Sequence, residues 1–214
     1  MSAISIICLI VAVVIAYLFG SINFAIIVTK LFAKKDIRDF GSGNAGMTNV
    51  LRTLGKGPAV LTLLGDLSKG ILAVLIARLL FTFVAQQPDN FIGEYAAAFC
   101  ALLGHIFPIF YGFKGGKGIL VSAGGLIMLE PIAFLCCLIV FLIFTLITKI
   151  VSVGSIACAI AFPIALAVIR NIQHAPQIGL EVLLASLISL LVIFMHRSNI
   201  KRLLRGEENS FKKK

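Results

Sequence analysis

The chain of 214 residues is 60% hydrophobic and only 13% charged, with a mean hydropathy of +1.08. A soluble domain carries about a quarter charged residues, so this composition excludes a soluble globular protein and indicates several membrane-spanning helices. The net charge is +10, but cytoplasmic loops of membrane proteins collect Lys and Arg for topological reasons, so we expect no nucleic-acid partner. We therefore expect an all-α, polytopic membrane protein that forms a single transmembrane domain over residues 1–214.

The first apolar segment, Ser2 to Val28, is uncharged and lacks the positive start of a cleaved signal peptide. It predicts a first helix that is retained. Lys30, Lys34, Lys35 and Arg38 follow at once. Because cytoplasmic loops are enriched in such cations, we expect the N-terminus outside and the end of this helix in the cytoplasm.

A polar insert, FGSGNAGMTNVLRTLGK, follows from Phe40 to Lys56. Its glycines allow the backbone to approach a ligand closely, its polar side chains and cations supply donors, and it contains no acidic residue. This chemistry is typical of an anion site, most often a phosphate site. The glycines are Gly41, Gly43, Gly46 and Gly55, and the polar residues are Ser42, Asn44, Thr48, Asn49, Arg52 and Lys56.

The second helix is expected to open near Pro58, since the first helical turn tolerates proline, and to run to about residue 84. Within it, Asp66 and Lys69 are three residues apart and share a face. An internal salt bridge and direct contact with a ligand are both open interpretations of this pair. Arg78 is interpreted as a snorkelling anchor at the outer end of the helix.

A short polar turn at Gln86 to Asn90 and a third helix from about Ile92 to Phe110 come next. A second glycine-rich insert, YGFKGGKG, then runs from Tyr111 to Gly118 and carries Lys114 and Lys117. Three crossings from an outside start place this insert in the cytoplasm, on the same side as the first.

The apolar run Ile119 to Leu129 is short for a crossing, and the sequence Glu130-Pro131 separates it from the run Ile132 to Ile147. We expect two helices here, the first being short or tilted, and one bent helix is the alternative. The remaining segments are a polar patch (Lys149, Ser152 and Ser155), an apolar run (Ile156 to Ile169), a turn (Arg170 to Gln177), a last span (Gly179 to Phe194) and a basic tail from Met195.

Seven helices make this topology consistent. With the N-terminus outside, both glycine inserts, the third patch and the basic tail all lie on the cytoplasmic side. Only Arg78 and Arg170 among the cations then fall on the outer side, while Lys69 lies within a span. Merging the fourth and fifth helices would place the third patch and the tail on the wrong sides.

Several familiar motifs are excluded. The segment from Gly112 to Gly118 has three residues, not four, between the glycines of a Walker A motif, and glycine follows Lys117. No histidine is followed five residues later by aspartate, so the His-x4-Asp arrangement of common glycerolipid acyltransferases is absent. The five cysteines lie in apolar runs without paired spacing, and no cluster has metal-ligand spacing, so we expect no disulfide framework and no metal.

Four segments together carry a family resemblance. These are GSGNAGMTNVLRTLGK (Gly41 to Lys56), GHIFPIFYGFKGGKG (Gly104 to Gly118), SVGSIA (Ser152 to Ala157) and HRSNIKRLLRG (His196 to Gly206). In this order they resemble the bacterial acyl-phosphate–glycerol-3-phosphate acyltransferase family, PlsY, over nearly the whole chain. Met47 stands where we expect an alanine, and the polar positions are intact.

The resemblance implies a seven-helix enzyme of the bacterial cytoplasmic (inner) membrane with its active site on the cytoplasmic face. It implies transfer of a fatty acyl group from acyl phosphate to the 1-hydroxyl of glycerol 3-phosphate, giving lysophosphatidic acid and phosphate, the first acylation of phospholipid synthesis. It implies no acyl-CoA or acyl carrier protein at this step. We expect no cofactor, a monomer, and membrane lipid as the only further partner.

The chemistry of these residues fits the expected reaction. Two phosphates must be held side by side with their repulsion offset, which suits cations and glycine-loop amides. Acyl phosphate is already activated, so no covalent acyl-enzyme is needed. The proton acceptor stays open between His196 and a substrate phosphate oxygen. The resemblance implies catalytic roles for Ser42, Arg52, Lys117, His196 and Asn199, and substrate binding by Gly43, Asn44, Gly46, Thr48, Asn49, Lys114, Gly116, Ser155 and Arg197.

Two other classes compete with this interpretation. A transporter for organic phosphates would also carry basic glycine-rich loops, but no inverted repeat or matching pair of interrupted helices is visible. A lipid-phosphate transferase with a nucleotide-activated donor usually needs a metal held by several carboxylates. The acidic residues near the proposed site, Asp36, Asp39 and Asp66, do not form such a cluster.

Overall fold

The structure is a computed structural model that describes residues 2–88 and 90–210. All regular elements in this described part are helical, which agrees with the all-α expectation. The chain forms two compact units, Met1–Leu129 and Glu130–Lys214, and each is described by itself.

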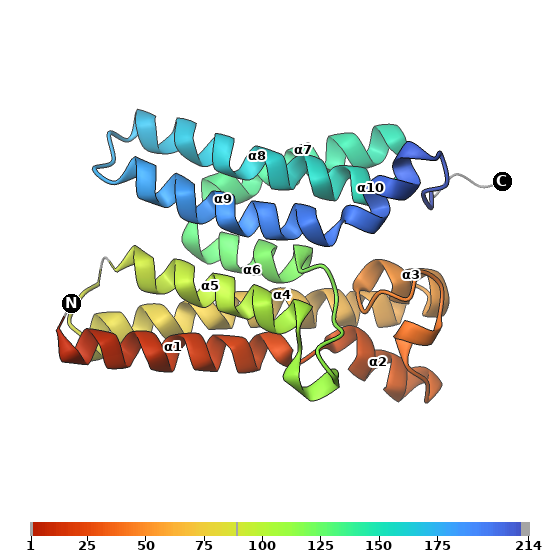
Figure 1. Cartoon of the computed structure of the whole chain (residues 1–214), viewed down its shortest axis with the longest axis horizontal. Helices are drawn as coiled ribbons and strands as arrows, with labels where there is room; N and C mark the ends of the chain where they lie inside the picture. The colour runs from red at the N-terminus through yellow and green to blue at the C-terminus, as the bar shows by residue number, and fades with distance from the viewer. Residues whose placement is uncertain (1, 89, 211–214) are drawn as a thin grey trace. The chain divides into compact units, whose positions relative to one another are not determined.

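The described residues of the first unit form six α-helices joined by short turns (Figure 1). Helix α1 packs against α5 and α4, and α4 packs against α6. The helices are α1 (Ala3–Ser21), α2 (Phe24–Ala33), α3 (Met47–Leu54), α4 (Lys56–Leu79) with a π-helical extension (Leu80–Val84), α5 (Phe91–Ile106) and α6 (Ile119–Leu129). Short 3₁₀ turns lie at Ile37–Asp39 and Ile109–Tyr111.

Glycines bring these helices close together. A Cβ atom on Gly20 of α1 would lie 2.2 Å from the carbonyl oxygen of Ala101 on α5. A Cβ atom on Gly70 of α4 would lie 2.1 Å from the carbonyl oxygen of Val121 on α6. Close backbone approach through small residues is how membrane helices pack when the hydrophobic effect no longer drives association. These contacts fix the frame from which both glycine inserts extend.

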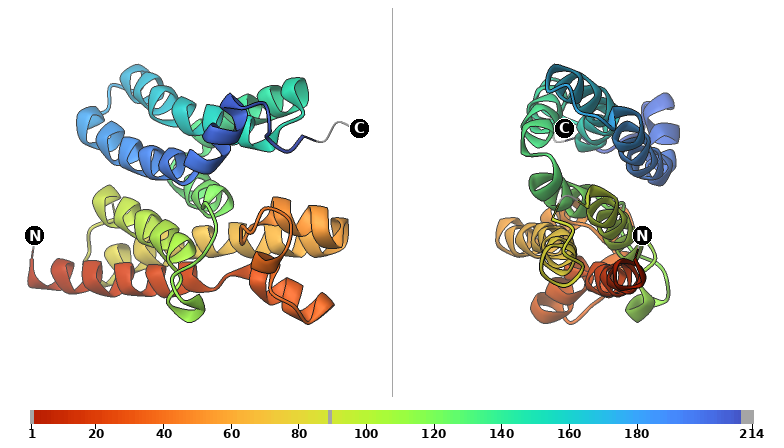
Figure 2. Two further views of the ribbon diagram at one scale, coloured as in Figure 1. Left: turned by 45° about the vertical axis from the view of Figure 1, so that its right-hand side comes forward. Right: turned by 90° about the vertical axis from the view of Figure 1, so that its left-hand side faces the viewer.

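The expected continuous first helix to Val28 is wrong, because the helix breaks after Ser21. The Asn23 side chain accepts a hydrogen bond from the Ile26 N–H at 3.1 Å and so caps a second helix, α2. Asparagine competes with helical hydrogen bonding in this way and favours helix starts. Figure 2 shows that α2 leaves the line of α1.

Helix α4 opens at Lys56 with Pro58 in its first turn, as predicted. The interpretation of Arg78 as a snorkelling anchor is corrected. Its guanidinium donates two hydrogen bonds to Glu94 of α5, at 2.9 and 2.7 Å, and a third to the Met128 carbonyl of α6 at 2.8 Å. Arg78 therefore ties three helices of the first unit together.

The second unit contains four helices, α7 (Pro131–Thr148), α8 (Val151–Ile172), α9 (Ile178–Met195) and α10 (Arg197–Leu204). Helix α8 packs against α7 and α9. Pro131 occupies the first turn of α7, and the chain leaves helix at Glu130, so α6 and α7 are separate helices as predicted. Arg170 of α8 forms ion pairs with both Glu130 and Glu181.

Two boundaries in this unit differ from expectation. Lys149 adopts a left-handed conformation (φ 61°) that ends α7, and α8 begins at Val151. Ser152 and Ser155 are therefore buried residues of α8 rather than a patch before it. Arg170 likewise belongs to the last turn of α8, where its two carboxylate partners hold it, and not to the following turn.

Six helical segments of the described residues are long and apolar enough to cross a membrane. They are 3–33, 56–84, 91–111, 131–148, 151–172 and 178–195. Helix α6 has 11 residues, which span about 16 Å of a hydrocarbon layer about 30 Å thick. The six long segments support a polytopic membrane protein, and the seventh crossing stays a prediction.

Candidate active site

The first glycine insert is a compact turn built around the Asn49 side chain. Its Nδ2 lies within hydrogen-bond distance of three carbonyl oxygens, those of Ile37 (3.1 Å), Phe40 (2.9 Å) and Asn44 (3.1 Å). Its Oδ1 accepts from the Ser42 N–H at 3.1 Å. Asn49 is buried, and these hydrogen bonds hold the insert in its folded shape.

The insert needs glycine where it wraps round Asn49. Gly41 has a φ of 55°, and a Cβ atom there would lie only 2.3 Å from Asn49 Oδ1. Gly43 has a φ of 69°, and its N–H donates to the Phe40 carbonyl at 2.9 Å. These left-handed positions form a tight turn that leaves Ser42 exposed at its tip.

The C-terminal half of the insert is a short helix, α3, which the sequence interpretation treated only as a polar insert. It begins at Met47, and the preceding residue, Gly46, has no side chain that could cap the first turn. Val50 is buried in a cluster with Ile26, Ile37 and Ala45, while Thr48 is partly buried and Arg52 is exposed in the last turn. A helix start favours anions, and Arg52 adds a full positive charge in the last turn of the same short helix.

Arg38, which the sequence interpretation treated only as a topology signal, links the two glycine inserts. Its Nη1 donates to the carbonyls of Tyr111 (2.8 Å) and Lys114 (3.1 Å), while Nε and Nη2 donate to the two carboxylate oxygens of Asp36. Hydrogen bonding from Arg38 lowers the pKa of Asp36 below its ordinary value. The Asp36 carboxylate therefore stays ionised and keeps Arg38 in place, and Arg38 holds the second insert near the first.

The second glycine insert is folded back onto the end of α5. The Gly115 N–H donates to the Ile106 carbonyl at 3.0 Å, and the Gly116 N–H donates to the His105 carbonyl at 3.2 Å. A Cβ atom on Gly116 would lie 2.5 Å from the Ala45 carbonyl oxygen of the first insert. The structure thus brings the two predicted inserts into contact within the first unit, with Lys114 exposed and Lys117 partly buried.

The second unit holds the remaining predicted residues, and one of them, Asn199, contacts Glu208. Its Oε1 accepts from the Ser152 hydroxyl (3.0 Å) and from Asn199 Nδ2 (2.7 Å), and its Oε2 accepts from Arg202 Nε (2.7 Å). Burial raises the pKa of Glu208, but these three hydrogen bonds outweigh burial and bring the pKa below its ordinary value. Sequence reasoning missed Glu208, whose only signal was an acidic residue in a strongly basic tail.

His196 is buried at the junction of α9 and α10. Its Nδ1 lies 2.8 Å from the Val192 carbonyl, and a carbonyl can only accept, so Nδ1 carries the proton and Nε2 has the lone pair of the neutral ring. This tautomer suits either a base or a hydrogen-bond acceptor. Ser155 is buried on α8, one turn beyond Ser152.

Arg197 is exposed and folds back on α9. Its guanidinium carbon lies 4.6 Å from the centre of the Phe194 ring, and Nη1 donates to the Phe194 carbonyl at 3.2 Å. The exposed position leaves the side chain accessible to a water-soluble anion.

Comparisons with known proteins agree with one another. The sequence model of a family described as "Glycerol-3-phosphate acyltransferase" matches residues 10–206. A glycerol-3-phosphate acyltransferase of Neisseria meningitidis serogroup C / serotype 2a is 44% identical over 207 residues, covering 95% of this chain and 97% of the relative. One of Clostridioides difficile strain 630 is 43% identical over 205 residues, covering 96% of both chains.

Two solved structures are also similar. The crystal structure of PlsY (YgiH), an integral membrane glycerol 3-phosphate acyltransferase, in its glycerol 3-phosphate form has a TM-score of 0.83 and 35% identity, covering 95% of this chain and 96% of that chain. The lysophosphatidic acid form has a TM-score of 0.80 and 34% identity, covering 95% of both chains.

Proposed function

The chain belongs to the glycerol-3-phosphate acyltransferase family, and we propose that it transfers a fatty acyl group from acyl phosphate to the 1-hydroxyl of glycerol 3-phosphate. The products are lysophosphatidic acid and inorganic phosphate. The observation that carries this proposal is the contact between two cationic glycine inserts in the first unit, where Gly116 meets Ala45. Two inserts with phosphate-binding chemistry suit a reaction whose donor and acceptor both carry phosphate.

The first insert supplies phosphate binding in this mechanism. Ser42 at the exposed tip, Thr48 in the first turn of α3 and the backbone amides of residues 44 and 45 donate to phosphate oxygens, and Arg52 pairs with the charge. Gly43, Gly46 and Asn44 shape this surface, and Asn49 holds it together, as its four backbone contacts support. Lys114, Lys117 and Gly116 of the second insert bind phosphate or stabilise the charge that develops at the reacting carbonyl.

Residues of the second unit serve glycerol 3-phosphate. Ser155 lines its pocket, while His196, Arg197 and Asn199 orient it. The Nδ1–H of His196 donates to the Val192 carbonyl, so Nε2 is the ring nitrogen that would accept the proton of the attacking hydroxyl, and a phosphate oxygen of the substrate is the alternative acceptor. No covalent acyl-enzyme is required, because the mixed anhydride of the donor is already activated.

We further propose that the protein is a monomer in the bacterial inner membrane. It forms one seven-helix transmembrane domain with its N-terminus outside and its site on the cytoplasmic face. Helix α6 supplies the seventh, short crossing. The cations of both inserts and of the basic tail support this orientation. A C-terminal fluorescent-protein fusion that folds only in the cytoplasm should fluoresce, and a dark fusion in well-expressed protein would contradict the topology.

Phosphate release by purified protein tests the reaction. Palmitoyl phosphate is supplied with and without glycerol 3-phosphate, and palmitoyl-CoA replaces it as an alternative donor. Phosphate release should require glycerol 3-phosphate. With palmitoyl-CoA, whose leaving group is the CoA thiol and not phosphate, neither free CoA thiol nor lysophosphatidic acid should form. Arg52→Ala and Lys117→Ala should each lower kcat/KM by about tenfold to a hundredfold, the value of a charge-assisted hydrogen bond, whereas Lys30→Ala on α2 should not. Turnover with palmitoyl-CoA alone would refute the proposal.

A further inference from the structure

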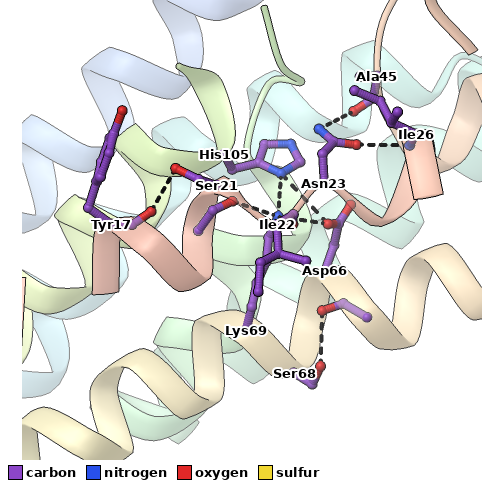
Figure 3. Close-up of polar contacts among 12 residues, drawn as sticks. Tyr17, Ser21, Ile22, Asn23, Ile26, Ala45, Asp66, Ser68, Lys69 and His105 are labelled. Carbon is purple, nitrogen blue, oxygen red and sulfur yellow. Dashed lines mark hydrogen bonds and ion pairs between the residues drawn. The ribbon is translucent and has the colours of Figure 1, made fainter. Parts of the chain in front are cut away.

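A buried charged cluster lies beside the break between α1 and α2, and the proposed mechanism uses none of it. Asp66, Lys69 and His105 are only 1%, 2% and 3% exposed. Lys69 Nζ lies 2.9 Å from Asp66 Oδ1 and 2.9 Å from His105 Nδ1 (Figure 3). Burying charges at this depth is costly even when they are paired, so the cluster calls for an explanation beyond stability.

Lys69 satisfies the carbonyl groups that the helix break releases. Its Nζ also lies 2.9 Å from the Gly20 carbonyl oxygen and 2.7 Å from that of Ile22. In a continuous helix these oxygens would accept from the N–H groups four residues on, but the break removes those partners. The ammonium also faces the negative end of the α1 dipole. Lys69 thereby fixes the break to α4.

His105 connects this cluster to the second insert. An ammonium can only donate, so His105 Nδ1 accepts from Lys69 and the ring proton lies on Nε2. Nε2 faces Gly116, because a Cβ atom on Gly116 would lie 2.3 Å from it. The backbone carbonyl of His105 also accepts from the Gly116 N–H at 3.2 Å. The side chain and the backbone of His105 thus both contact the same glycine.

The first insert also packs against Gly116, through Ala45. Its Ala45 carbonyl would lie 2.5 Å from a Cβ atom on Gly116 and accepts from Asn23 Nδ2 at 3.5 Å. Asn23 is the residue after Ile22, whose carbonyl accepts from Lys69. The break, both inserts, α4 and α5 therefore all meet at this cluster.

We propose that Lys69 and His105 are positioning residues, which set where the second insert and its Lys117 lie against the first insert. Asp66, whose Oδ1 lies 2.9 Å from Lys69 Nζ, holds the Lys69 side chain in place. The expected effect on turnover rests on the proposed function, but the placement of the insert does not, and the two are measured separately.

Chemical labelling measures the placement directly. Brief treatment with acetic anhydride followed by mass spectrometry gives the acetylation rates of Lys114 and Lys117. His105→Leu removes both the acceptor for Lys69 and the group facing Gly116, so it should change the Lys117 rate about threefold or more. His105→Asn keeps an acceptor near the Nδ1 position and should lie closer to the wild type.

A matched control separates positioning from general loosening. Glu94→Gln weakens the Arg78–Glu94 pair between the same two helices and should lower thermal stability without changing Lys117 labelling. Gly116→Ala puts a Cβ atom against His105 Nε2 and the Ala45 carbonyl while keeping Asp66, Lys69 and His105 themselves, so it tests the idea even if His105→Leu does not fold. Unchanged Lys117 labelling in the folded variants would overturn the inference.

Kinetics supply the second arm. A positional error of about 1 Å can cost about a hundredfold in rate, so His105→Leu should lower kcat/KM by about tenfold to a hundredfold. In a Lys117→Arg background the same change should have much less effect, because residues that act through one another are not additive. An equal loss in both backgrounds would refute the positioning role. Altered labelling in a protein without turnover on any donor would support the placement and reject the proposed function instead.

Discussion

Replacing Asn49 by aspartate tests whether this side chain holds the first insert together. The substitution keeps volume and the oxygen that accepts from Ser42, but it removes both amide protons and puts a carboxylate against the carbonyls of Ile37, Phe40 and Asn44. An amide nitrogen has two protons, so two net hydrogen bonds are lost, worth about 1–3 kcal/mol before any charge repulsion.

This free energy should appear as local opening, since the insert lies at one end of its unit. A cost of about 1–3 kcal/mol corresponds to opening about fivefold to 150-fold more often. Hydrogen exchange by mass spectrometry over residues 37–49 should accelerate by this factor in Asn49→Asp, and kcat/KM should fall at least as much. Asn171→Asp, an exposed change on α8, is the control and should leave exchange in the insert unchanged.

Unchanged exchange over residues 37–49 in folded Asn49→Asp protein would refute the reasoning. If activity is nevertheless lost, Asn49 acts directly on phosphate, as the family resemblance implies. If exchange and activity are both unchanged, Asn49 has neither role.

Three further predictions follow from the same contacts. Gly116→Ala should lower kcat/KM by about tenfold or more, because its Cβ would meet His105 Nε2 and the Ala45 carbonyl oxygen. Gly57→Ala should not, because a Cβ atom there meets no atom within 4 Å. Equal kinetics in the two variants would contradict the close packing at Gly116. Lys69→Met should destabilise the protein by about 3–5 kcal/mol by leaving Asp66 unpaired, and thermal melts should show partial recovery in Asp66→Asn/Lys69→Met. The pKa of Glu208 is lowered in the folded protein, so its carboxylate stabilises the fold above the ordinary pKa of 4.5, and this stabilisation is lost as the pH falls through the folded-state pKa. The difference in melting temperature between the wild type and Glu208→Gln should therefore shrink on acidification. A difference that grows would contradict the assignment.

Much of the helix layout followed from hydropathy and proline placement. The separation of α6 from α7 was predictable because Pro131 is tolerated in a first helical turn, and the Asp66–Lys69 pair was predictable from its spacing. The break after Ser21 has a local signal that hydropathy alone passes over, because Gly20, Ser21 and Asn23 interrupt the apolar run and Asn23 caps α2. The lysine that satisfies the freed carbonyls was not predictable, since it lies 47 or more residues away.

For the candidate site, too, composition was informative in the sequence, whereas the contacts of individual side chains were not visible in it. The glycine inserts and their phosphate chemistry were visible because donor-rich, acid-free segments stand out in an apolar chain. The tasks of individual side chains were not, because they depend on partners distant in sequence. Glu208 gathers Ser152 and Asn199 from separate helices of its unit, and only the folded chain shows this.

The conversion of labelled glycerol 3-phosphate into lipid by the purified protein is the decisive measurement. With palmitoyl phosphate as the only donor, we expect labelled 1-acyl lysophosphatidic acid and one inorganic phosphate released for each molecule formed. Folded protein that forms no labelled lipid from palmitoyl phosphate, or that forms it only from palmitoyl-CoA, would contradict the account.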